Sequence, residues 1–309
     1  MFKRLGLKLL GSLGVIKSEL KKPKSLLIYY GFPSLINDAK SIDEAVDAFS
    51  PYDYIVLGDG LSLESHSDHQ KTLEIISDAK MQESKVYGYI DAGMTTQKLS
   101  ISEIEMRVDG WKAMGVAGIF LDDFGFDFKV SRDRQNKIID YVHEKELQVI
   151  VNAWNADDVF SITNESRLNR DAQSSHLDEN DFYLMESYQV ALSQYESLES
   201  WQERSRGMKI YQDIVGFKIL SITTSNAPYN EEAFYYTWYS ALFDEHEATG
   251  WGEINFGATH QKSLFHDRPK LDDELFFIGG IKDKNGIVKR ETNLGRIEID
   301  TNEHQVCVS

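Results

Sequence analysis

The sequence predicts an α/β protein built on a (β/α)8 barrel, a TIM barrel, and three observations lead to this fold class. Short apolar runs of strand character alternate with helical patterns from Ser25 to Thr259. These runs recur about every 30 residues, which is typical of repeated strand–helix units. Several runs end in carboxylates, amides or tyrosines, and catalytic groups of such barrels stand at the carboxyl ends of strands.

The predicted elements follow one another as strand and helix. A run that is apolar throughout predicts a parallel strand buried on both faces. Such strands are expected to begin near Leu26, Tyr54, Val86, Gly118, Gln148, Phe182, Phe217 and Trp251. Ser41-x-x-Glu44 and Ser100-x-x-Glu103 predict helix starts, because each pair can satisfy two free backbone amides. Eight similar periods favour a closed barrel over an open doubly wound sheet.

Three parts are expected along the chain: a basic amphipathic arm at 1–24, the barrel at 25–262 and a β-rich C-terminal extension at 263–309. Pro23 separates the arm from the barrel. In the extension, short alternating runs flank Asn285-Gly286, which is typical of a hairpin turn. We expect the extension to pack on the barrel or to mediate assembly.

Composition limits the partners and the compartment. The formal charge of −17 opposes binding to nucleic acid or to an anionic membrane, and it suits a neutral or cationic partner such as an amino-sugar polymer. No apolar run approaches the ~20 residues of a membrane span. The only cysteine, Cys307, excludes an internal disulfide and leaves the compartment open. Lys8 interrupts the apolar N-terminus, which favours an arm over a signal peptide.

Two strand-end acids predict the chemistry. Asp122 and Asp123 end the run that starts at Gly118, and Glu186 ends the run that starts at Phe182. Because side chains alternate along a strand, only one of the two aspartates can face the mouth fully, and we favour Asp122 as the reactive group, with Asp123 as an orienting or rim residue. Glycoside hydrolysis needs two carboxyl groups, and alternate barrel strands can bring them to the ~5–5.5 Å of retaining enzymes.

Other strand ends have the composition of a sugar site. Aromatic faces stack on pyranose rings, and carboxylates or amides bind hydroxyls and amines. The candidate substrate-binding residues are Tyr29, Tyr30, Asp91, Asp123, Asn152, Trp154, Tyr188 and Glu253. A divalent-metal hydrolase at Asp122, Asp123 and Asp127 is the weaker alternative, since no phosphate-binding glycine loop accompanies these acids. We expect no cofactor and no metal.

The same motifs resemble a known group of hydrolases. Tyr29-Tyr30-Gly31, Tyr89-Ile-Asp91, Gly118-Ile-Phe-Leu-Asp122, Val151-Asn152 and Met185-Glu186-Ser187 occur in the order found in the endo-α-1,4-polygalactosaminidase group, glycoside hydrolase family 114. The chain also resembles spherulin-4-like proteins and the hydrolase domain of the Pel polysaccharide protein. The resemblance covers residues 26–256 and is carried by short motifs.

The resemblance implies a barrel that hydrolyses α-1,4-linked galactosamine or N-acetylgalactosamine polymers without a metal. It places the catalytic carboxyls at Asp122 and Glu186 but leaves their roles open; we favour Asp122 as the nucleophile and Glu186 as the acid/base. Tyr89-Ile-Asp-Ala-Gly93 departs from the Gly-Glu pair more common in relatives, which puts the substrate in doubt. The alternative is a non-catalytic carbohydrate-binding or structural barrel on a cell surface or a phage tail fibre. An extracellular or virion location is therefore favoured.

Overall fold

The computed structural model describes residues 17–58, 60–163, 166–259 and 261–309. Within them, eight parallel strands close into a barrel in the order β10-β11-β2-β3-β4-β5-β6-β7. The strands are β2 (Lys24–Tyr29), β3 (Tyr54–Leu57), β4 (Lys85–Asp91), β5 (Gly118–Asp122), β6 (Gln148–Val151), β7 (Phe182–Met185), β10 (Lys218–Ile222) and β11 (Ala248–Gly250). The predicted (β/α)8 barrel is confirmed.

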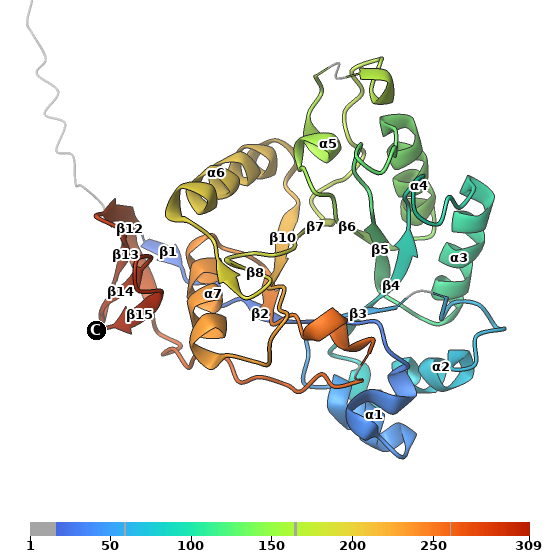
Figure 1. Cartoon of the computed structure of the whole chain (residues 1–309), viewed down its shortest axis with the longest axis horizontal. Helices are drawn as coiled ribbons and strands as arrows, with labels where there is room; N and C mark the ends of the chain where they lie inside the picture. The colour runs from blue at the N-terminus through green and yellow to red at the C-terminus, as the bar shows by residue number, and fades with distance from the viewer. Residues whose placement is uncertain (1–16, 59, 164–165, 260) are drawn as a thin grey trace, which may run out of the picture.

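Helices surround the strands (Figure 1). The α-helices are α1 (Ile42–Phe49), α2 (His69–Ser77), α3 (Ile101–Ala113), α4 (Arg132–Glu144), α5 (Asp157–Phe160), α6 (Leu198–Val215) and α7 (Glu231–Phe243). Short 3-10 helices lie in four connections, η1 (Pro33–Asp38), η2 (Ala79–Met81), η3 (Ser166–Leu168) and η4 (Ile254–Gly257). Ser100 and Glu103 form the predicted capping box at the start of α3, and Ser41 caps α1 by accepting from the Glu44 amide. No helix of the described chain is long and apolar enough to cross a membrane.

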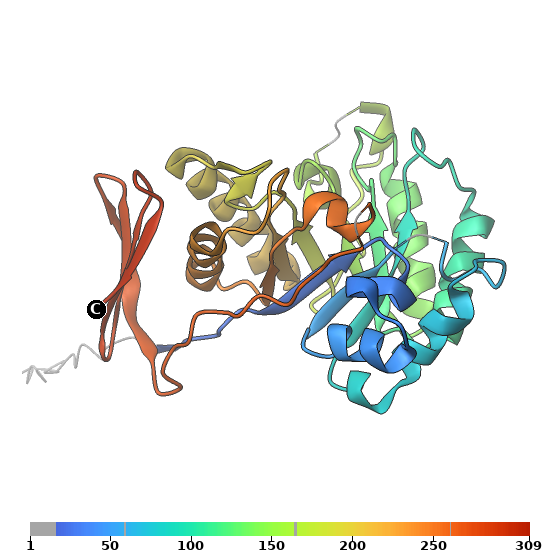
Figure 2. The same cartoon turned by 60° about the horizontal axis from the view of Figure 1, so that its bottom comes forward.

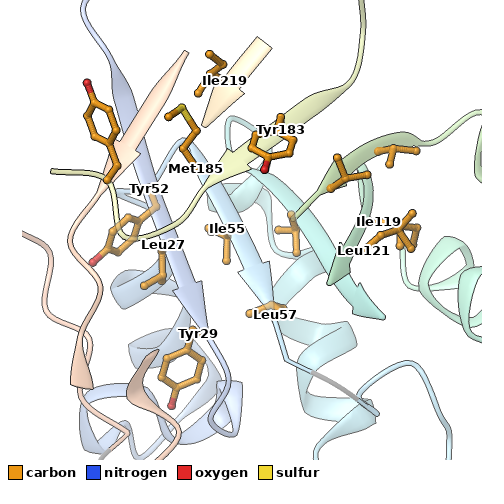
Figure 3. Packing of buried hydrophobic residues seen from close by; sticks show 14 of the residues in the cluster. Leu27, Tyr29, Tyr52, Ile55, Leu57, Ile119, Leu121, Tyr183, Met185 and Ile219 are labelled. Carbon is orange, nitrogen blue, oxygen red and sulfur yellow. The ribbon is translucent and has the colours of Figure 1, made fainter. Parts of the chain in front are cut away.

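Two apolar layers hold the barrel together. Outward-facing side chains such as Leu27, Ile55, Ile119 and Tyr183 fill the space between strands and helices (Figure 3). Inward-facing side chains form a second cluster inside the barrel, in which Tyr54, Tyr87 and Phe182 lie at its N-terminal end and Phe120 and Ile222 further along. This filled interior makes the barrel a packed core rather than a channel.

The C-terminal extension is an antiparallel sheet, as predicted, but it also takes a strand from the N-terminal arm. Its order is β1-β12-β13-β14-β15, with β1 (Lys17–Glu19), β12 (Phe276–Lys284), β13 (Ile287–Thr292), β14 (Gly295–Asp300) and β15 (Gln305–Val308). Asn285 and Gly286 have positive φ and form the predicted hairpin turn between β12 and β13. The sheet lies beside the barrel, against α7 (Figure 2).

One sequence expectation meets a different outcome here. The eighth strand does not begin near Trp251: β11 ends at Gly250, because its residues Ala-Thr-Gly are small and leave no apolar run to detect. In the described part of the expected arm, β1 pairs with β12 of the extension. The rest of the arm, 1–16, lies outside the described residues, and the division at 24 and 262 stays a prediction.

Candidate active site

Side-chain alternation brings two carboxyl groups to the mouth of the barrel, at the carboxyl ends of its strands. On β5, Phe120 lies in the barrel interior and Leu121 faces the helices, so Asp122 turns inward. On β7, Leu184 lies inside, and Glu186 follows it at the same alternation. The strands β5 and β7 are separated by β6 alone, which places both acids on one side of the mouth.

Both carboxyl groups are easier to protonate than in water. Burial raises the pKa of Asp122 from 3.8 to about 7, and the negative charges of Asp123 and Glu186 add to this shift. The backbone of Asp123 and the hydroxyl of Tyr89 act in the opposite direction as hydrogen-bonding groups. The pKa of Glu186 is raised by burial and by the charge of Asp123. Two neighbouring half-buried acids with raised pKa values are typical of acid–base sites.

The backbone turns sharply directly after each of these acids. Asp123, after Asp122, has φ 51°, and Ser187, after Glu186, has φ 54°. Non-glycine residues adopt this left-handed conformation at a cost, and such strain concentrates at functional sites. The Ser187 hydroxyl lies 2.8 Å from the Thr224 hydroxyl after β10, which fixes the turn that carries Glu186. Neither Ser187 nor Thr224 was predicted, because a hydroxyl at a strand end gives no distinctive sequence signal.

Two tyrosines form an aromatic wall beside the acids. The rings of Tyr30, directly after β2, and Tyr89, on β4, meet edge to face at 5.3 Å between centroids. Burial raises the pKa of Tyr30, and the negative charges of Asp122 and Glu186 raise it further. The hydroxyl of Tyr30 therefore lies near both acids. Tyr89 belongs to the predicted strand end Tyr89-Ile-Asp91 but is not among the predicted substrate-binding residues, although alternation turns both Tyr89 and Asp91 inward.

Asp91 lies beside Asp122 in the register of β4 and β5, but its carboxylate organises a loop. Its Oδ1 accepts hydrogen bonds from the amide of Gly93 and the hydroxyl of Thr96, both at 2.7 Å, and its Oδ2 accepts from the amide of Gln97. Asp91 is buried. The loop it holds lies against Asp123, so Asp91 supports the wall of the site rather than opening onto it.

The next strand contributes an amide and an exposed indole. Asn152 follows β6, is half-buried, and donates from Nδ2 to the carbonyl of Leu184 at 3.2 Å. Trp154, two residues later, is 88% exposed. The exposed indole presents a flat apolar face to the solvent.

Three predicted site residues lie elsewhere. Tyr29 packs outward against Phe49 of α1 and is fully buried. Tyr188 is also fully buried, and its hydroxyl donates to Asp244 at 2.8 Å on the outside of the barrel. Glu253 precedes η4, and its Oε1 lies 2.7 Å from Nε2 of His266. The structure therefore brings together Tyr30, Asp91, Asp122, Asp123, Asn152 and Glu186, with Trp154 at the rim.

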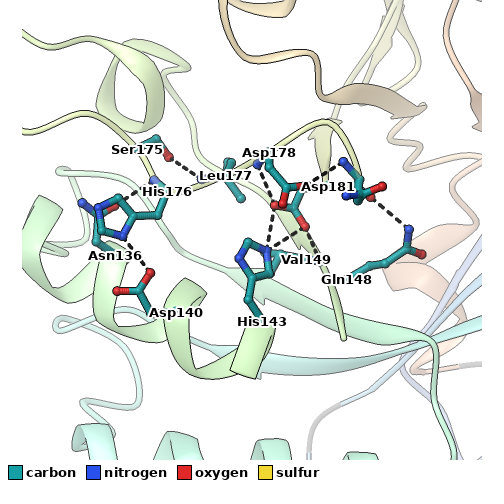
Figure 4. Close-up of polar contacts among 11 residues, drawn as sticks. Asn136, Asp140, His143, Gln148, Val149, Ser175, His176, Leu177, Asp178 and Asp181 are labelled. Atoms are coloured by element: carbon teal, nitrogen blue, oxygen red, sulfur yellow. Dashed lines mark hydrogen bonds and ion pairs between the residues drawn. The ribbon is translucent and has the colours of Figure 1, made fainter. Parts of the chain in front are cut away.

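The residues suggested for a metal do not converge at the mouth. Asp127 turns toward Gly125 and Asp158. Among the described residues, the one group of three ligand-type side chains within 4.8 Å of one another is His143, Asp178 and Asp181, at the opposite end of the barrel (Figure 4). There the Asp181 carboxylate already accepts from the Val149 and Asp178 amides, besides its contact with His143, so it serves as a cap for these backbone groups.

Comparison with known proteins shows the fold. No family model and no curated protein matches the chain. The chain is similar to Amy13B of Eubacterium rectale, with a TM-score of 0.53 and 7% identity over 93% of this chain and 87% of that one. At that identity the likeness shows a shared fold and nothing more.

Further solved structures are less similar. They include a glycoside hydrolase family 5 enzyme from Prevotella bryantii, with TM-score 0.45, 6% identity and coverage of 77% of this chain and 91% of that one. They also include an O-GlcNAc hydrolase of Thermobaculum terrenum, with TM-score 0.43, 12% identity and coverage of 75% and 55%. The chain spans 23% of the length of two pyruvate carboxylase chains from Rhizobium etli that it also matches.

Proposed function

We propose that the protein is a glycoside hydrolase that cleaves a polysaccharide with Asp122 and Glu186. One observation carries the proposal: two half-buried acids with raised pKa values end alternate strands on the inner side of the barrel mouth. Glycoside hydrolysis uses such a pair, one carboxyl to protonate the leaving oxygen and one carboxylate to attack the anomeric carbon or to activate water.

The pKa pattern favours a division of roles opposite to the one that the sequence favours. A general acid works best when its pKa lies near the working pH, and the pKa of Asp122 is about 7. Asp122 is then the acid/base, and Glu186 is the nucleophile. Both side chains point inward from strands that only β6 separates, so their carboxyls face the same space at the mouth. A retaining mechanism requires the two carboxyls to lie about 5–5.5 Å apart, and the configuration of the first product tests it.

The charges of the site favour a substrate with amino groups. The charged groups with the largest effects on the pKa of Asp122, Asp123 and Glu186 are all carboxylates. Such a mouth attracts a protonated amine and repels an acidic glycan. The aromatic wall of Tyr30 and Tyr89 and the exposed Trp154 offer ring faces to sugar. We therefore propose an amino-sugar polymer of the α-1,4-galactosamine or N-acetylgalactosamine type, cleaved within the chain.

The proposal is tested by mass spectrometry of the oligosaccharides released from a panel of polymers. The panel contains acetylated and deacetylated α-1,4-galactosamine chains, a glucosamine polymer and an acidic polysaccharide. We expect internal fragments from the galactosamine chains with the wild type, after exhaustive chelation as well, and none with Glu186→Gln or Asp122→Asn. NMR of the first product is expected to show retained α configuration. Binding without fragments from any polymer would instead identify a non-catalytic carbohydrate-binding barrel.

A further inference from the structure

A cavity of about 860 Å³ lies at the opposite end of the barrel from the mouth. It opens between the segment before β2, the ends of α6 and α7, and the C-terminal sheet, and its volume is in the range of small-molecule sites. Its lining contains six cationic side chains: Lys21, Lys22, Lys24, Lys209, Lys218 and Arg290. This concentration of positive charge stands out in a chain with a formal charge of −17.

The carboxylates of the lining do not neutralise all of these cations. Asp213 pairs with Lys209, Glu245 with Arg290, and Glu247 with Lys24. The fourth lining acid, Asp244, is hydrogen-bonded inside the protein by Tyr188, Trp201 and Ser205. Lys22 reaches Asp273 outside the lining. Among the described side chains, Lys21 and Lys218 form no ion pair, so the cavity keeps an excess of positive charge.

Three lysines lie beside this cavity at the N-terminal end of the barrel. Lys24, Lys85 and Lys218 are the first residues of β2, β4 and β10. Their ammonium groups lie 5.6–5.7 Å from the rings of Tyr54 or Phe182, which close the bottom of the barrel. Burial and the charges of Lys24 and Lys218 lower the pKa of Lys85, so these two lysines disfavour the charge of Lys85. Glu247 is the one acid that pairs with any of the three among the described residues.

We propose that this lysine-rich cavity binds an anion that carries phosphate or sulfate groups. Lysine ammonium groups act as point charges for such oxygens, and a multivalent anion relieves the repulsion among Lys24, Lys85 and Lys218. The aromatic floor keeps water from one side of the ammonium groups, which strengthens the attraction. The site stands apart from Asp122 and Glu186 by the length of the barrel strands, so it does not depend on the proposed glycosidase activity.

Isothermal titration with inorganic triphosphate at low salt tests the proposal on the full-length chain. We expect one saturable site in the wild type, and a dissociation constant at least tenfold higher in Lys85→Gln/Lys218→Gln. The matched control is Lys137→Gln, which removes an exposed lysine of α4 paired with Asp133 and is expected to bind like the wild type. Melting temperatures should remain equal or rise in the double variant, because it loses like-charge repulsion.

Vesicles distinguish the two sources of phosphate. Sedimentation with phosphatidylglycerol vesicles but not phosphatidylcholine vesicles, lost in Lys85→Gln/Lys218→Gln, would identify a lipid headgroup; binding of triphosphate alone would identify a free anion. The proposal fails if neither probe binds. It fails equally if Lys137→Gln weakens binding as much as the double variant, because the attraction would then come from net charge alone.

Discussion

The two ends of this barrel are made from the same eight strands, yet they differ in how they treat polar groups. At the N-terminal end, Tyr54 donates to Glu247 and Tyr87 donates to Gln148, and with Phe182 their rings close the interior. At the mouth, Asp122 and Glu186 are half-buried and lie beside other acids. The tyrosines that close one end have partners for their hydroxyls and stabilise the fold, whereas the mouth holds repelling carboxyl groups and backbone strain that chemistry can use.

The largest effect expected from this contrast is on turnover. Glu186→Gln and Asp122→Asn should each lower kcat by at least about 10³-fold, because each removes one of the two groups that the reaction needs. Tyr87→Phe at the closed end should change kcat by less than about twofold. Steady-state kinetics on the polymer identified by mass spectrometry measures all three variants.

The roles of the two acids can be separated with azide in the Glu186→Ala and Asp122→Ala variants. Azide replaces a missing nucleophile, so it should restore turnover in Glu186→Ala and give a glycosyl azide of inverted configuration. Rescue of this kind in Asp122→Ala would reverse the assignment. The free wild-type enzyme should also lose kcat/KM as the pH rises through about 7, where Asp122 gives up its proton.

The free energy of unfolding should depend more on the closed end of the barrel than on the mouth. Phe182→Ala removes a fully buried ring from the closed end and should lower the free energy of unfolding by about 3–5 kcal/mol. Glu186→Gln should lower it by less than about 1 kcal/mol, since it keeps the volume of the side chain and removes a charge from an acidic cluster. Urea denaturation followed by circular dichroism compares the two, and equal losses would contradict the division between the two ends.

Much of this contrast could be predicted from the sequence, because both ends rest on strand alternation. The run from Gly118 to Asp122 predicts a buried strand and an inward acid, and the structure places them so. The same rule, applied to the tyrosine pair at the end of β2, separates the inward Tyr30 from the outward Tyr29. The lysine cavity could not be predicted, since it joins segments as distant in sequence as Lys22 and Arg290.

Alternation fails where the backbone leaves the strand region. Tyr188 stands two residues after Glu186 and should share its direction, but the left-handed Ser187 between them turns Tyr188 outward to Asp244. The apolar Trp251 predicts a strand that would include Glu253, whereas β11 consists of small residues and ends at Gly250, so Glu253 lies beyond it. A left-handed serine and a strand without apolar residues both lack a sequence signal.

The raised pKa of Asp122 at the mouth should also make the free energy of unfolding depend on pH. Because folding raises the pKa of Asp122 from 3.8 to about 7, the folded state prefers the protonated acid, and stability is lost as the pH rises from about 4 to 7. Asp122→Asn removes this loss and should stabilise the protein at pH 8 by up to about 4 kcal/mol, at about 1.4 kcal/mol per pKa unit. Urea titrations of the wild type and Asp122→Asn at pH 4 and pH 8 measure this difference in stability. An equal difference at both pH values would contradict the link between the pKa of Asp122 and folding.

The smallest expected effect tests how the segment after Glu186 is held. Tyr188→Phe removes the hydrogen bond to Asp244, which keeps its bonds from Trp201 and Ser205, and should lower the free energy of unfolding by about 1 kcal/mol. If this bond positions Glu186, kcat should fall about threefold with KM unchanged. Tyr141→Phe, which removes an exposed tyrosine–aspartate hydrogen bond on α4, is the matched control. An unchanged kcat in Tyr188→Phe would leave the bond a purely structural role and assign the positioning of Glu186 to the contact of Ser187 with Thr224.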